Sequence, residues 1–311
     1  TPSAQTSYTY RALATKDNYV NSDAATPLTF TIYKLQAPSW GSFSNIENGK
    51  RVTLTAYSAY VNGSNNTPVS GVSTSYTAPT STLTLSGATS ATKDWTGTAY
   101  PSGKVLTAIS SLDGYISSTS TTTLTLYKLS TPTIAAAVNA TPGKSVKITC
   151  STYITSSGTS AVSGVKCHYT TNGTTTPTSS SSSVASGSSL TLIAAGTYTV
   201  KAIGILAGYV SSAVATGTEF SITQLAAPTI TKTAIVGGYT DTYTSANGNT
   251  LYYSLNGGTS YSNTAIGTTV SYSADIKPSA QTTYNIWAYN RKSGYADSAV
   301  TKHSEFTIYK L

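Results

Sequence analysis

The chain has 311 residues, enough for two to four domains, and only 9% of them are charged. Methionine is absent, 24 residues are tyrosine, and Ser, Thr and Gly are abundant. Because β-branched residues form long runs and no segment of helical length shows a 3.6-residue period, the composition argues against a helical protein and predicts an all-β one.

The net charge is +8, from 18 basic and 10 acidic residues. A nucleic-acid interface needs its basic residues clustered on one face. Here they are scattered singly, and two short pairs, Lys50-Arg51 and Arg291-Lys292, lie far apart. Single lysines on strands have another explanation, because they discourage edge-to-edge pairing of sheets. Since the basic residues are not clustered, we expect no nucleic-acid partner. A diffuse positive field could still attract acidic polysaccharide. No apolar run is long enough to span a membrane.

A short motif divides the chain into segments. It ends four successive segments, at Tyr33-Lys-Leu35, Tyr127-Lys-Leu129, Thr223-Gln-Leu225 and Tyr309-Lys-Leu311. A proline follows three residues after each of the first three copies, and proline suits a junction because it cannot donate a ladder hydrogen bond. A turn tyrosine also recurs once in each segment. The spacing predicts half a repeat at 1–35 and whole repeats at 36–129, 130–225 and 226–311.

Residues 1–35 are expected to form only the C-terminal half of a repeat. They contain two strand patterns, Tyr8–Ala12 and Phe30–Leu35, with a turn at Tyr19 between them. Half a sandwich cannot bury its inner face, so either upstream residues or another chain must supply the missing strands. This half aligns without a gap to residues 277–311, which suggests a three-repeat unit within a longer tandem protein.

The three whole repeats follow in order. In the first, strands are predicted near 39–44, 51–60, 72–77, 82–86, 95–100, 104–110 and 121–128, and seven short strands indicate an immunoglobulin-like sandwich. Turns are expected at Asn62-Gly63 and Pro101-Ser-Gly103. The second repeat shares the Gly-Lys-x-Val and Val-Ser-Gly-Val runs of the first. The third has a turn at Asn256-Gly257-Gly258 and an expected core anchor at Trp287.

The second repeat carries the most specific sequence pattern. Its segments are Tyr169-Thr-Thr-Asn-Gly-Thr, Tyr198-Thr-Val-Lys-Ala-Ile and Gly208-Tyr209-Val-Ser-Ser-Ala-Val. Through them it resembles the chitobiase/β-hexosaminidase C-terminal type of immunoglobulin-like repeat, a fibronectin-III-associated module of bacterial secreted and surface proteins. The resemblance implies an accessory module without catalytic residues. The expected fold class is therefore all-β, with tandem immunoglobulin-like or fibronectin-III-like β-sandwich domains in a rod.

Cys150 and Cys167 are the two cysteines of the chain. They lie on neighbouring predicted strands, at 146–150 and 165–169, so a disulfide that closes this hairpin is sterically plausible. Two free buried thiols are the alternative. A disulfide would require an oxidising compartment and would agree with secretion.

Catalytic and metal-binding residues form no recognisable pattern. The ten carboxylates are spread singly, and neither His168 nor His303 belongs to a motif that links it to a particular serine. Zinc would need more cysteine or histidine ligands, and calcium at the junctions would need carboxylates that the Lys-Leu-x-Ala-Pro type of sequence lacks. We predict no enzymatic activity, no metal and no cofactor.

Tyrosines fall into two groups. Tyr8, Tyr115, Tyr198, Tyr209 and Tyr295 recur with the repeat, like Trp287, and are expected in core and corner packing. Seven others do not recur. They could form an exposed row that binds glycan or a neighbouring subunit, or they could simply lie on the strand surface without a binding role. These candidates are Tyr57, Tyr60, Tyr76, Tyr239, Tyr243, Tyr253 and Tyr261.

The pattern of repetition without a catalytic site predicts a non-catalytic extracellular structural protein. Its repeats would build a bacterial surface stalk, filament or adhesin, and its partners would be other copies of itself or neighbouring surface proteins. One alternative is a carbohydrate-binding accessory region of a secreted glycoside hydrolase. Another is a phage or virion fibre protein.

Overall fold

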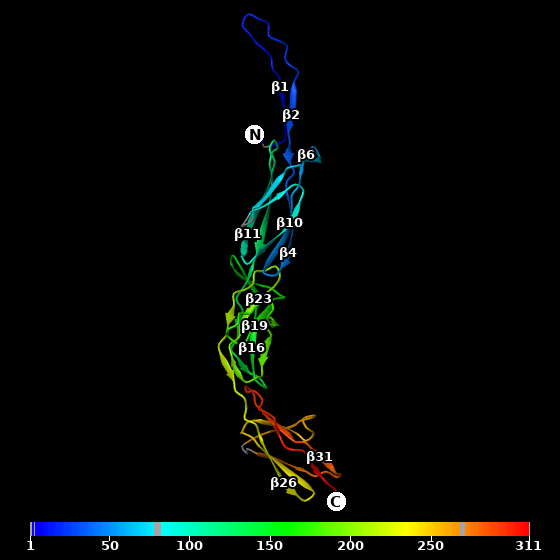
Figure 1. The fold of residues 1–311 in the computed structure, drawn as a ribbon. Coiled ribbons are helices and arrows are strands. Elements are labelled where there is room, and N and C mark those ends of the chain that lie inside the picture. Colours follow the sequence, from blue (N-terminus) through cyan, green and yellow to red (C-terminus); the bar gives the residue numbers. More distant parts are fainter. Residues whose placement is uncertain (1, 3, 78–81, 268–270, 311) are drawn as a thin grey trace. The chain divides into compact units, whose positions relative to one another are not determined.

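The structure, a computed structural model, describes residues 2, 4–77, 82–267 and 271–310. In these ranges the regular elements are β-strands, and the ladders between them are antiparallel (Figure 1). The prediction of an all-β protein is confirmed. Within the same ranges no helix is long and apolar enough to cross a membrane.

The chain folds into two compact units. The first contains Thr1–Leu129, Thr152–Ala161 and Ile205–Ser211, and the second contains Ser130–Ser151, Val162–Gly204 and Ser212–Leu311. The second predicted repeat thus contributes to both units, and the four-part division at 35, 129 and 225 stays a prediction. We call residues 36–129, 130–225 and 226–311 the first, second and third repeat, and residues 2–32 the amino-terminal hairpin.

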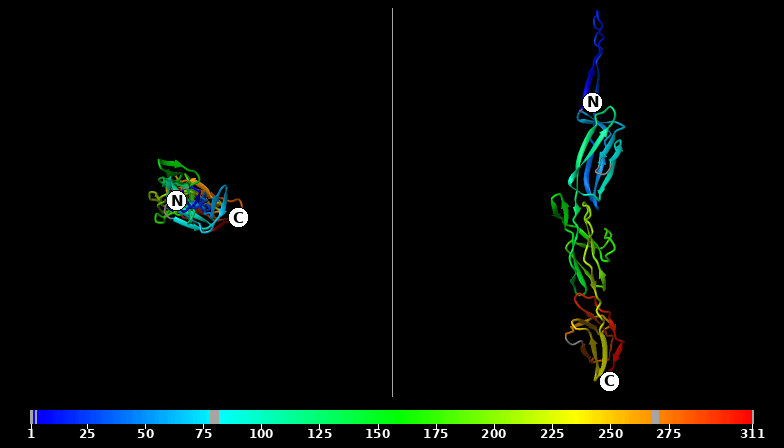
Figure 2. Two further views of the ribbon diagram at one scale, coloured as in Figure 1. Left: turned by 90° about the horizontal axis from the view of Figure 1, so that it is seen from above. Right: turned by 90° about the vertical axis from the view of Figure 1, so that its left-hand side faces the viewer.

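The amino-terminal hairpin consists of β1 (Thr6–Tyr10) and β2 (Leu28–Ile32). The two strands pair with each other, and among the described residues neither pairs with a third strand (Figure 1 and the right-hand view of Figure 2). Because side chains alternate across a strand, hydroxyl groups cover one face and aromatic or aliphatic groups the other. The apolar face is open: Tyr10 is 58%, Leu28 67% and Phe30 42% exposed. This agrees with the expectation that half a repeat cannot bury its inner face.

The first repeat is a sandwich of two sheets, in strand orders β10-β5-β4 and β12-β11-β8-β9. The strands are β4 (Ser39–Ile46), β5 (Gly49–Thr55), β8 (Ser73–Thr77), β9 (Thr82–Ser86), β10 (Ser90–Thr96), β11 (Tyr100–Ser111) and β12 (Ser118–Leu126). Both sheets contribute buried side chains to one core, which contains Val52, Leu54, Tyr76, Trp95, Leu106, Ala108 and Leu124. Where one strand contributes two residues to this core, as β5 does with Val52 and Leu54, they lie two positions apart.

Three details of the first repeat differ from the sequence prediction. The strand predicted at 95–100 is interrupted, because β10 ends at Thr96, Gly97 takes a left-handed conformation and β11 begins at Tyr100. The predicted strand 51–60 is split, because β5 ends at Thr55 and β6 (Ala59–Asn62) belongs to another sheet with β7 (Asn65–Pro68) and β3 (Lys34–Leu35). The predicted turn at 101–103 is instead part of β11. A register shift between Tyr100 and Lys104 accommodates this segment, so its glycine and proline produce an irregularity within the strand rather than an end.

The second repeat has short strands. They are β13 (Lys128–Leu129), β14 (Thr133–Ile134), β15 (Val138–Asn139), β16 (Lys144–Thr149), β17 (Thr152–Thr155), β18 (Gly158–Ala161), β19 (Lys166–Thr170), β20 (Ser183–Ala185), β21 (Ser189–Leu192), β22 (Gly196–Tyr198), β23 (Lys201–Ile205), β24 (Ala215–Thr216) and β25 (Phe220–Ile222). Within the first unit β13, β17 and β18 form one sheet. Within the second unit β16 joins β14, β15 and β21, while β19 joins β20 and β23.

A disulfide joins Cys150 to Cys167, whose Cα atoms lie 5.9 Å apart. Of the two alternatives left open by the sequence, the structure contains the bridge. The expectation that it closes a hairpin is wrong, however. Cys150 follows β16 and Cys167 lies within β19, and these strands belong to different sheets. The bond therefore links the two layers of the second repeat.

The third repeat is again a two-layer sandwich, with sheets β26-β27-β30 and β29-β28-β32-β33 and a separate pair β31-β34. The strands are β26 (Thr229–Ile235), β27 (Gly238–Thr244), β28 (Thr250–Ser254), β29 (Ser262–Ala265), β30 (Ser271–Ile276), β31 (Thr282–Tyr284), β32 (Trp287–Arg291), β33 (Thr301–Lys302) and β34 (Phe306–Ile308). Its buried core contains Tyr243, Leu251, Ile266, Ile276, Ile286 and Ala288.

Trp287 is not the core anchor that the sequence suggested. On β32 the buried side chains are those of Ala288 and Asn290, so Trp287 points to the opposite face and is only half-buried. The large buried aromatic of this repeat is Tyr243 on the facing sheet. The expected turn at 256–258 is present, with both Gly257 and Gly258 in the left-handed region.

Candidate functional site

The best-defined recurrent arrangement joins the end of one repeat to a loop of the next. We call the last three residues of each segment the linker and the turn that carries the recurrent tyrosine the Gly-Tyr loop. In the first copy the Leu35 N–H donates to the Ile116 C=O and the Ile116 N–H donates to the Tyr33 C=O, both at 2.9 Å. These two bonds form a parallel bridge between linker and loop.

The same pair of bonds occurs twice more. At the second linker the Leu129 N–H donates to the Val210 C=O (2.9 Å) and the Val210 N–H donates to the Tyr127 C=O (2.8 Å). At the third linker the Leu225 N–H donates to the Ala296 C=O (3.1 Å) and the Ala296 N–H donates to the Thr223 C=O (3.0 Å). Leu35 and Leu129 are also buried, at 1% exposure each. These three linkers are therefore parts of folded joints rather than free tethers.

Glycine shapes the Gly-Tyr loop. Gly114, Gly208 and Gly294 have φ angles of 82°, 87° and 83°, a region that costs an L side chain about 1–2 kcal/mol. In the amino-terminal hairpin, Asn18 takes the corresponding place with a φ of 66°. The recurrent tyrosine follows this residue in all four loops, so the local sequence sets the loop conformation.

A turn of the preceding repeat covers two of these loops. In the first unit the Gly208 N–H donates to the Ile46 C=O at 2.9 Å, and the Ser211 N–H donates to Oδ1 of Asn48 at 3.0 Å. In the second unit the Gly294 N–H donates to the Ala140 C=O at 2.9 Å. Around Gly114, by contrast, no described residue comes within 4 Å of where a Cβ would lie.

Tyrosine rings pack around two of the joints. Tyr60 lies 4.5 Å from Tyr33 and 5.5 Å from Tyr115, measured between ring centroids. The equivalent cluster around the second linker is made by Tyr127, Tyr153 and Tyr209, with centroids 4.7 to 6.5 Å apart. Burial, together with its two tyrosine neighbours, raises the pKa of Tyr209. Tyr60, predicted as a member of an exposed row, is thus a joint residue.

Two other candidate tyrosines belong to the cores. Tyr76 is 2% exposed and donates its hydroxyl to the Thr55 C=O at 2.6 Å, while burial raises its pKa to about 12. Tyr243 is fully buried, and burial raises its pKa as well. The prediction of an exposed row is therefore wrong for both residues, because a strand pattern shows alternation without showing which face is inside.

The remaining candidates are half-buried and lie apart. The hydroxyl of Tyr57 is 3.4 Å from Oγ of Ser39. Tyr239 packs edge-on against Phe306 at 5.3 Å, and the Tyr253 hydroxyl lies 3.1 Å from that of Tyr272. Tyr261 packs edge-on against Tyr289 at 5.2 Å. A binding role for these four stays a prediction.

An aromatic cluster that the sequence did not reveal lies on the outer face of β28 and β32. Tyr252 and Tyr289 are cross-strand partners whose rings stack at 4.9 Å with an angle of 9° between planes. The guanidinium of Arg291 lies 4.9 Å from the Tyr252 ring, and Nζ of Lys302 lies 4.0 Å from the Trp287 ring. Only the cross-strand register brings these side chains together, and no local sequence motif encodes it.

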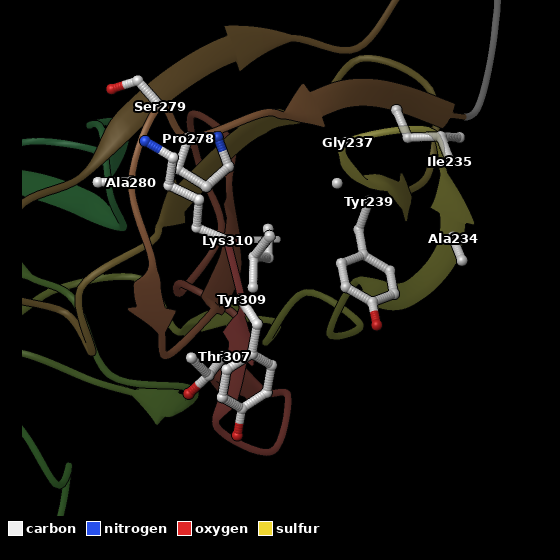
Figure 3. A pocket seen from close by; sticks show the side chains of 12 residues that line it. Ala234, Ile235, Gly237, Tyr239, Pro278, Ser279, Ala280, Thr307, Tyr309 and Lys310 are labelled. Carbon is white, nitrogen blue, oxygen red and sulfur yellow. The ribbon is translucent and has the colours of Figure 1, made fainter.

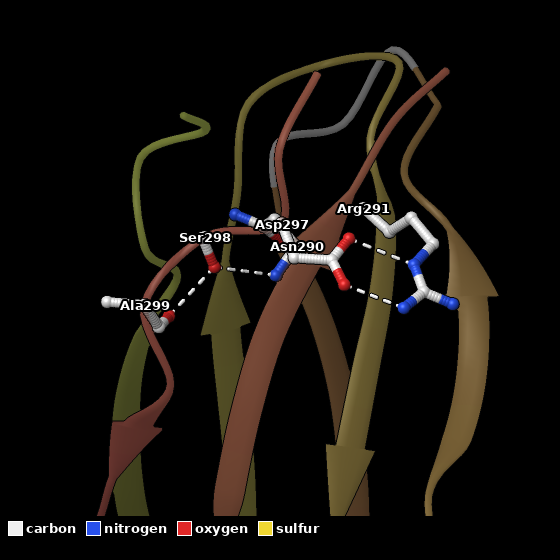
Figure 4. A network of polar contacts seen from close by, with 5 residues as sticks. All are labelled: Asn290, Arg291, Asp297, Ser298 and Ala299. Carbon is white, nitrogen blue, oxygen red and sulfur yellow. Dashed lines mark hydrogen bonds and ion pairs between the residues drawn. The ribbon is translucent and has the colours of Figure 1, made fainter. Parts of the chain in front are cut away.

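Arg291 is held by Asp297 from the Gly-Tyr loop of the third repeat (Figure 4). Nε donates to Oδ1 at 2.9 Å and Nη2 to Oδ2 at 2.6 Å, a bidentate pair that raises the pKa of Arg291. On the same loop Oγ of Ser298 accepts the Asn290 N–H at 2.9 Å and donates to the Ala299 C=O at 2.8 Å. These bonds fix the loop against β32.

Asp241 is a buried charge that the sequence analysis missed. It is fully buried on β27, and neither of its carboxyl oxygens has a hydrogen-bond partner among the described residues. Burial raises its pKa, while the nearby His303, Lys232 and Tyr243 side chains act in the opposite direction. The equivalent strand positions in the other repeats are the buried Val52 and Val146. An alignment of the repeats with one another could have identified Asp241, because it places this aspartate at a position that is valine in the other two.

In the described ranges no group of three or more His, Cys, Asp and Glu side chains is placed to hold a metal ion. Nδ1 of His168 lies 3.0 Å from the Ser181 C=O, and Nδ1 of His303 lies 3.0 Å from the Ser304 C=O. The absence of catalysis, cofactor and metal stays a prediction.

A shallow groove of about 520 Å³ lies at one end of the third repeat (Figure 3). Three parts of the repeat line it, namely residues 234–235 with 237–239, residues 278–280 and residues 307–310. Tyr309, the fourth copy of the linker tyrosine, is 73% exposed there, and Val236 at the tip of the turn is 96% exposed. Tyr309 is the uncovered counterpart of the linker tyrosines Tyr33 and Tyr127, which pack against other tyrosines in their joints.

Comparison with known proteins does not name a family. No family model matches the chain, so the resemblance of the second repeat to the chitobiase/β-hexosaminidase C-terminal type stays a prediction, and no curated protein matches either. Among solved structures, the chain is similar to the FN1–FN3 domains of chicken CNTN1, with 9% identity over 88% of this chain and 99% of that one and a TM-score of 0.32. It is also similar to the chicken interferon gamma receptor alpha chain, with 11% identity over 57% of this chain and 98% of that one and a TM-score of 0.21.

Proposed function

We propose that the chain is a non-catalytic structural protein that works outside the cell as a spacer of directly joined β-sandwich repeats. The observation that carries the proposal is the joint. Two backbone hydrogen bonds link the linker to the Gly-Tyr loop in three places, and each copy has a final leucine in the linker and a Gly-Tyr pair in the loop. A chain that merely tethered independent domains would have no need of a repeated, folded junction, since flexible linkers carry few such bonds.

The cysteines support a site of action outside the cell. Both take part in the disulfide, and such bonds persist in oxidising compartments. The chain has few charged residues and many Ser and Thr hydroxyl groups. Such side chains keep the outer faces of the strands hydrated without producing a strong electrostatic field. On this basis the finer role is that of a surface stalk, filament or adhesin, with other copies or neighbouring surface proteins as partners.

The stiffness of the joints is open to a direct test by small-angle X-ray scattering. Gly208→Val places a side chain against Asn45 at the covered joint, whereas Gly187→Val introduces a comparable backbone strain, at a φ of 84°, where no described atom lies within 4 Å of the Cβ site. We expect the distance distribution to broaden for Gly208→Val and to match the unmodified chain for Gly187→Val. A broad distribution in the unmodified chain, or equal broadening in both variants, would contradict the proposal.

Binding of polysaccharide is a second candidate, favoured by the outer aromatic cluster of β28 and β32. Tyrosine and tryptophan faces stack on sugar rings, and Tyr252, Tyr289 and Trp287 share this sheet face. Tyr252→Ser should then reduce retention on insoluble polysaccharides such as chitin or cellulose, while Tyr57→Ser should not. Equal retention of both variants, or none by the unmodified chain, would argue against this function.

A further inference from the structure

The amino-terminal hairpin has the same backbone register as a pair of strands in the third repeat. Tyr8 faces Phe30 across β1 and β2, and Tyr284 faces Phe306 across β31 and β34. On the opposite face the hydroxyl oxygens of Ser7 and Thr31 lie 2.7 Å apart, and those of Thr283 and Thr307 lie 2.8 Å apart. The segments 2–6 and 30–35 also repeat the sequence of 278–282 and 306–311. The hairpin is thus a second copy of the back half of the third repeat.

The loop that connects the two strands keeps the third-repeat geometry as well. Oγ of Ser22 accepts the Ala14 N–H at 2.9 Å and donates to the Asp23 C=O at 3.0 Å. Ser298 makes the corresponding bonds on its own loop, at 2.9 and 2.8 Å (Figure 4). These hydrogen bonds of the connecting loop are therefore the same in both copies.

What the hairpin lacks is the front half that covers this unit in the third repeat. There, Phe306 packs against Tyr239 of β27 at 5.3 Å, and β32 pairs along its length with β28. Both covering strands come from residues 226–276. In the hairpin, Phe30 is 42% exposed, and residues 11–16, the counterparts of β32 and the residue after it, form no strand. An apolar face and an unpaired strand segment are left open side by side.

The neighbouring joint is open at the matching place. The Gly-Tyr loops at Gly208 and Gly294 donate to a turn of the preceding repeat, but the loop at Gly114 has no such neighbour among the described residues. The 226–276 segment contains a turn of the required kind, 235–238. Its Gly238 matches Gly49 and Gly143, because a Cβ at each of these three glycines would overlap a carbonyl oxygen of the adjacent strand. One segment would therefore supply both missing parts.

We propose that the amino-terminal hairpin and the Gly114 loop form an acceptor for a second copy of residues 226–276. The segment lays its β27 equivalent on the apolar face, pairs its β28 equivalent with residues 11–15, and accepts the Gly114 N–H at the carbonyl of its Ile235. Main-chain ladder bonds supply affinity and the apolar face supplies specificity, as in other cases of strand addition. This acceptor is independent of the structural role proposed above and would operate equally in a polysaccharide-binding protein.

A fused chain tests the proposal most directly. A second copy of 226–276 is placed before residue 1, and amide hydrogen exchange is measured on the fused and unfused chains. We expect amides 11–15 to become protected only in the fused chain, and Phe30→Ser to abolish that protection. Thr9→Ala, on the hydroxyl-covered face, is the matched control and should leave it intact. Unprotected amides in the fused chain, or protection that survives Phe30→Ser, would overturn the proposal.

A titration with the separate 226–276 segment tests whether a second molecule can fill the acceptor. Fluorescently labelled 226–276 is titrated into the full chain, whose third repeat already contains its own copy. Saturable one-to-one binding, weakened at least about tenfold by Phe30→Ser, is expected if a separate molecule can fill the acceptor; a tenfold change corresponds to about 1.4 kcal/mol. If the labelled segment binds with equal affinity to the Phe30→Ser chain, it binds elsewhere and the acceptor is refuted.

Discussion

Replacing Asp241 by valine should stabilise the third repeat at neutral pH. The carboxyl is fully buried, and neither oxygen has a hydrogen-bond partner among the described residues. Leaving a buried polar group unsatisfied costs about 1–3 kcal/mol, and valine is the residue that fills the equivalent position in both other repeats. We therefore expect Asp241→Val to raise the local free energy of unfolding by about 1–3 kcal/mol at pH 7.

The stability of the third repeat should also depend on pH in a definite direction. Because burial raises the pKa of Asp241, the folded third repeat binds a proton more tightly than the unfolded chain does. Its stability is therefore greatest near and below the ordinary aspartate pKa of about 3.9 and decreases as the pH rises through the raised pKa. The advantage of Asp241→Val should therefore be smaller at pH 4 than at pH 7.

Urea unfolding followed by hydrogen exchange and mass spectrometry of third-repeat peptides measures this difference within the full chain. Asp241→Asn is the control, because it removes the charge and keeps the polar shape. It should lose the pH dependence without the whole gain in stability. If Asp241→Val is no more stable than the unmodified chain at pH 7, or if its advantage is the same at pH 4, the argument from burial is refuted.

Three further predictions concern the other features of the structure. Gly187→Ala should lower the free energy of unfolding in urea by about 1–2 kcal/mol, because alanine must adopt a left-handed conformation. Gly143→Ala should lower it distinctly more, because its Cβ also overlaps a carbonyl oxygen of the adjacent strand. Equal losses in the two variants would refute this reasoning. Replacing Cys150 and Cys167 by serine removes a bridge over 17 residues and should lower the unfolding free energy by about 3 kcal/mol, whereas an unchanged midpoint would show that the bridge contributes nothing. Asn48→Gly keeps the positive φ but removes the acceptor for a Gly-Tyr loop amide, so exchange at that amide should rise roughly fivefold, for a bond of about 1 kcal/mol, while the first-repeat core stays unchanged. An unchanged amide would mean that this bond does not hold the loop.

The sequence marks the two parts of each joint because both are local patterns, although the contact between them was not predicted. A glycine before three of the loop tyrosines, and Asn18 before the fourth, permits the left-handed turn. A leucine preceded by Tyr-Lys, or in one copy by Thr-Gln, marks where each linker ends. The hydrogen bonds between them follow once both motifs occupy neighbouring positions. The open face of the amino-terminal hairpin was also expected, because the alignment of 1–35 with 277–311 shows which half of a repeat is present.

Features that depend on pairing between distant strands could not be predicted. Alternation assigns side chains to two faces of a strand without saying which face is inside, so Trp287 was expected in the core and Tyr243 on the surface. Nor does alternation say which sheet a strand joins. The disulfide was therefore expected within a hairpin although Cys167 lies in the sheet opposite Cys150. The stacked pair Tyr252 and Tyr289 exists only through cross-strand register.

The most direct test of the structural account is the exchange rate of the joint amides, measured by NMR on the intact chain. The Leu129 and Val210 N–H groups form the bridge of one joint. If the repeats are joined by folded junctions, both amides should be protected about as well as amides in the core strands, because opening the joint then requires cooperative local unfolding. If both exchange as fast as exposed loop amides while the cores stay protected, the repeats move independently and the proposed spacer function is wrong.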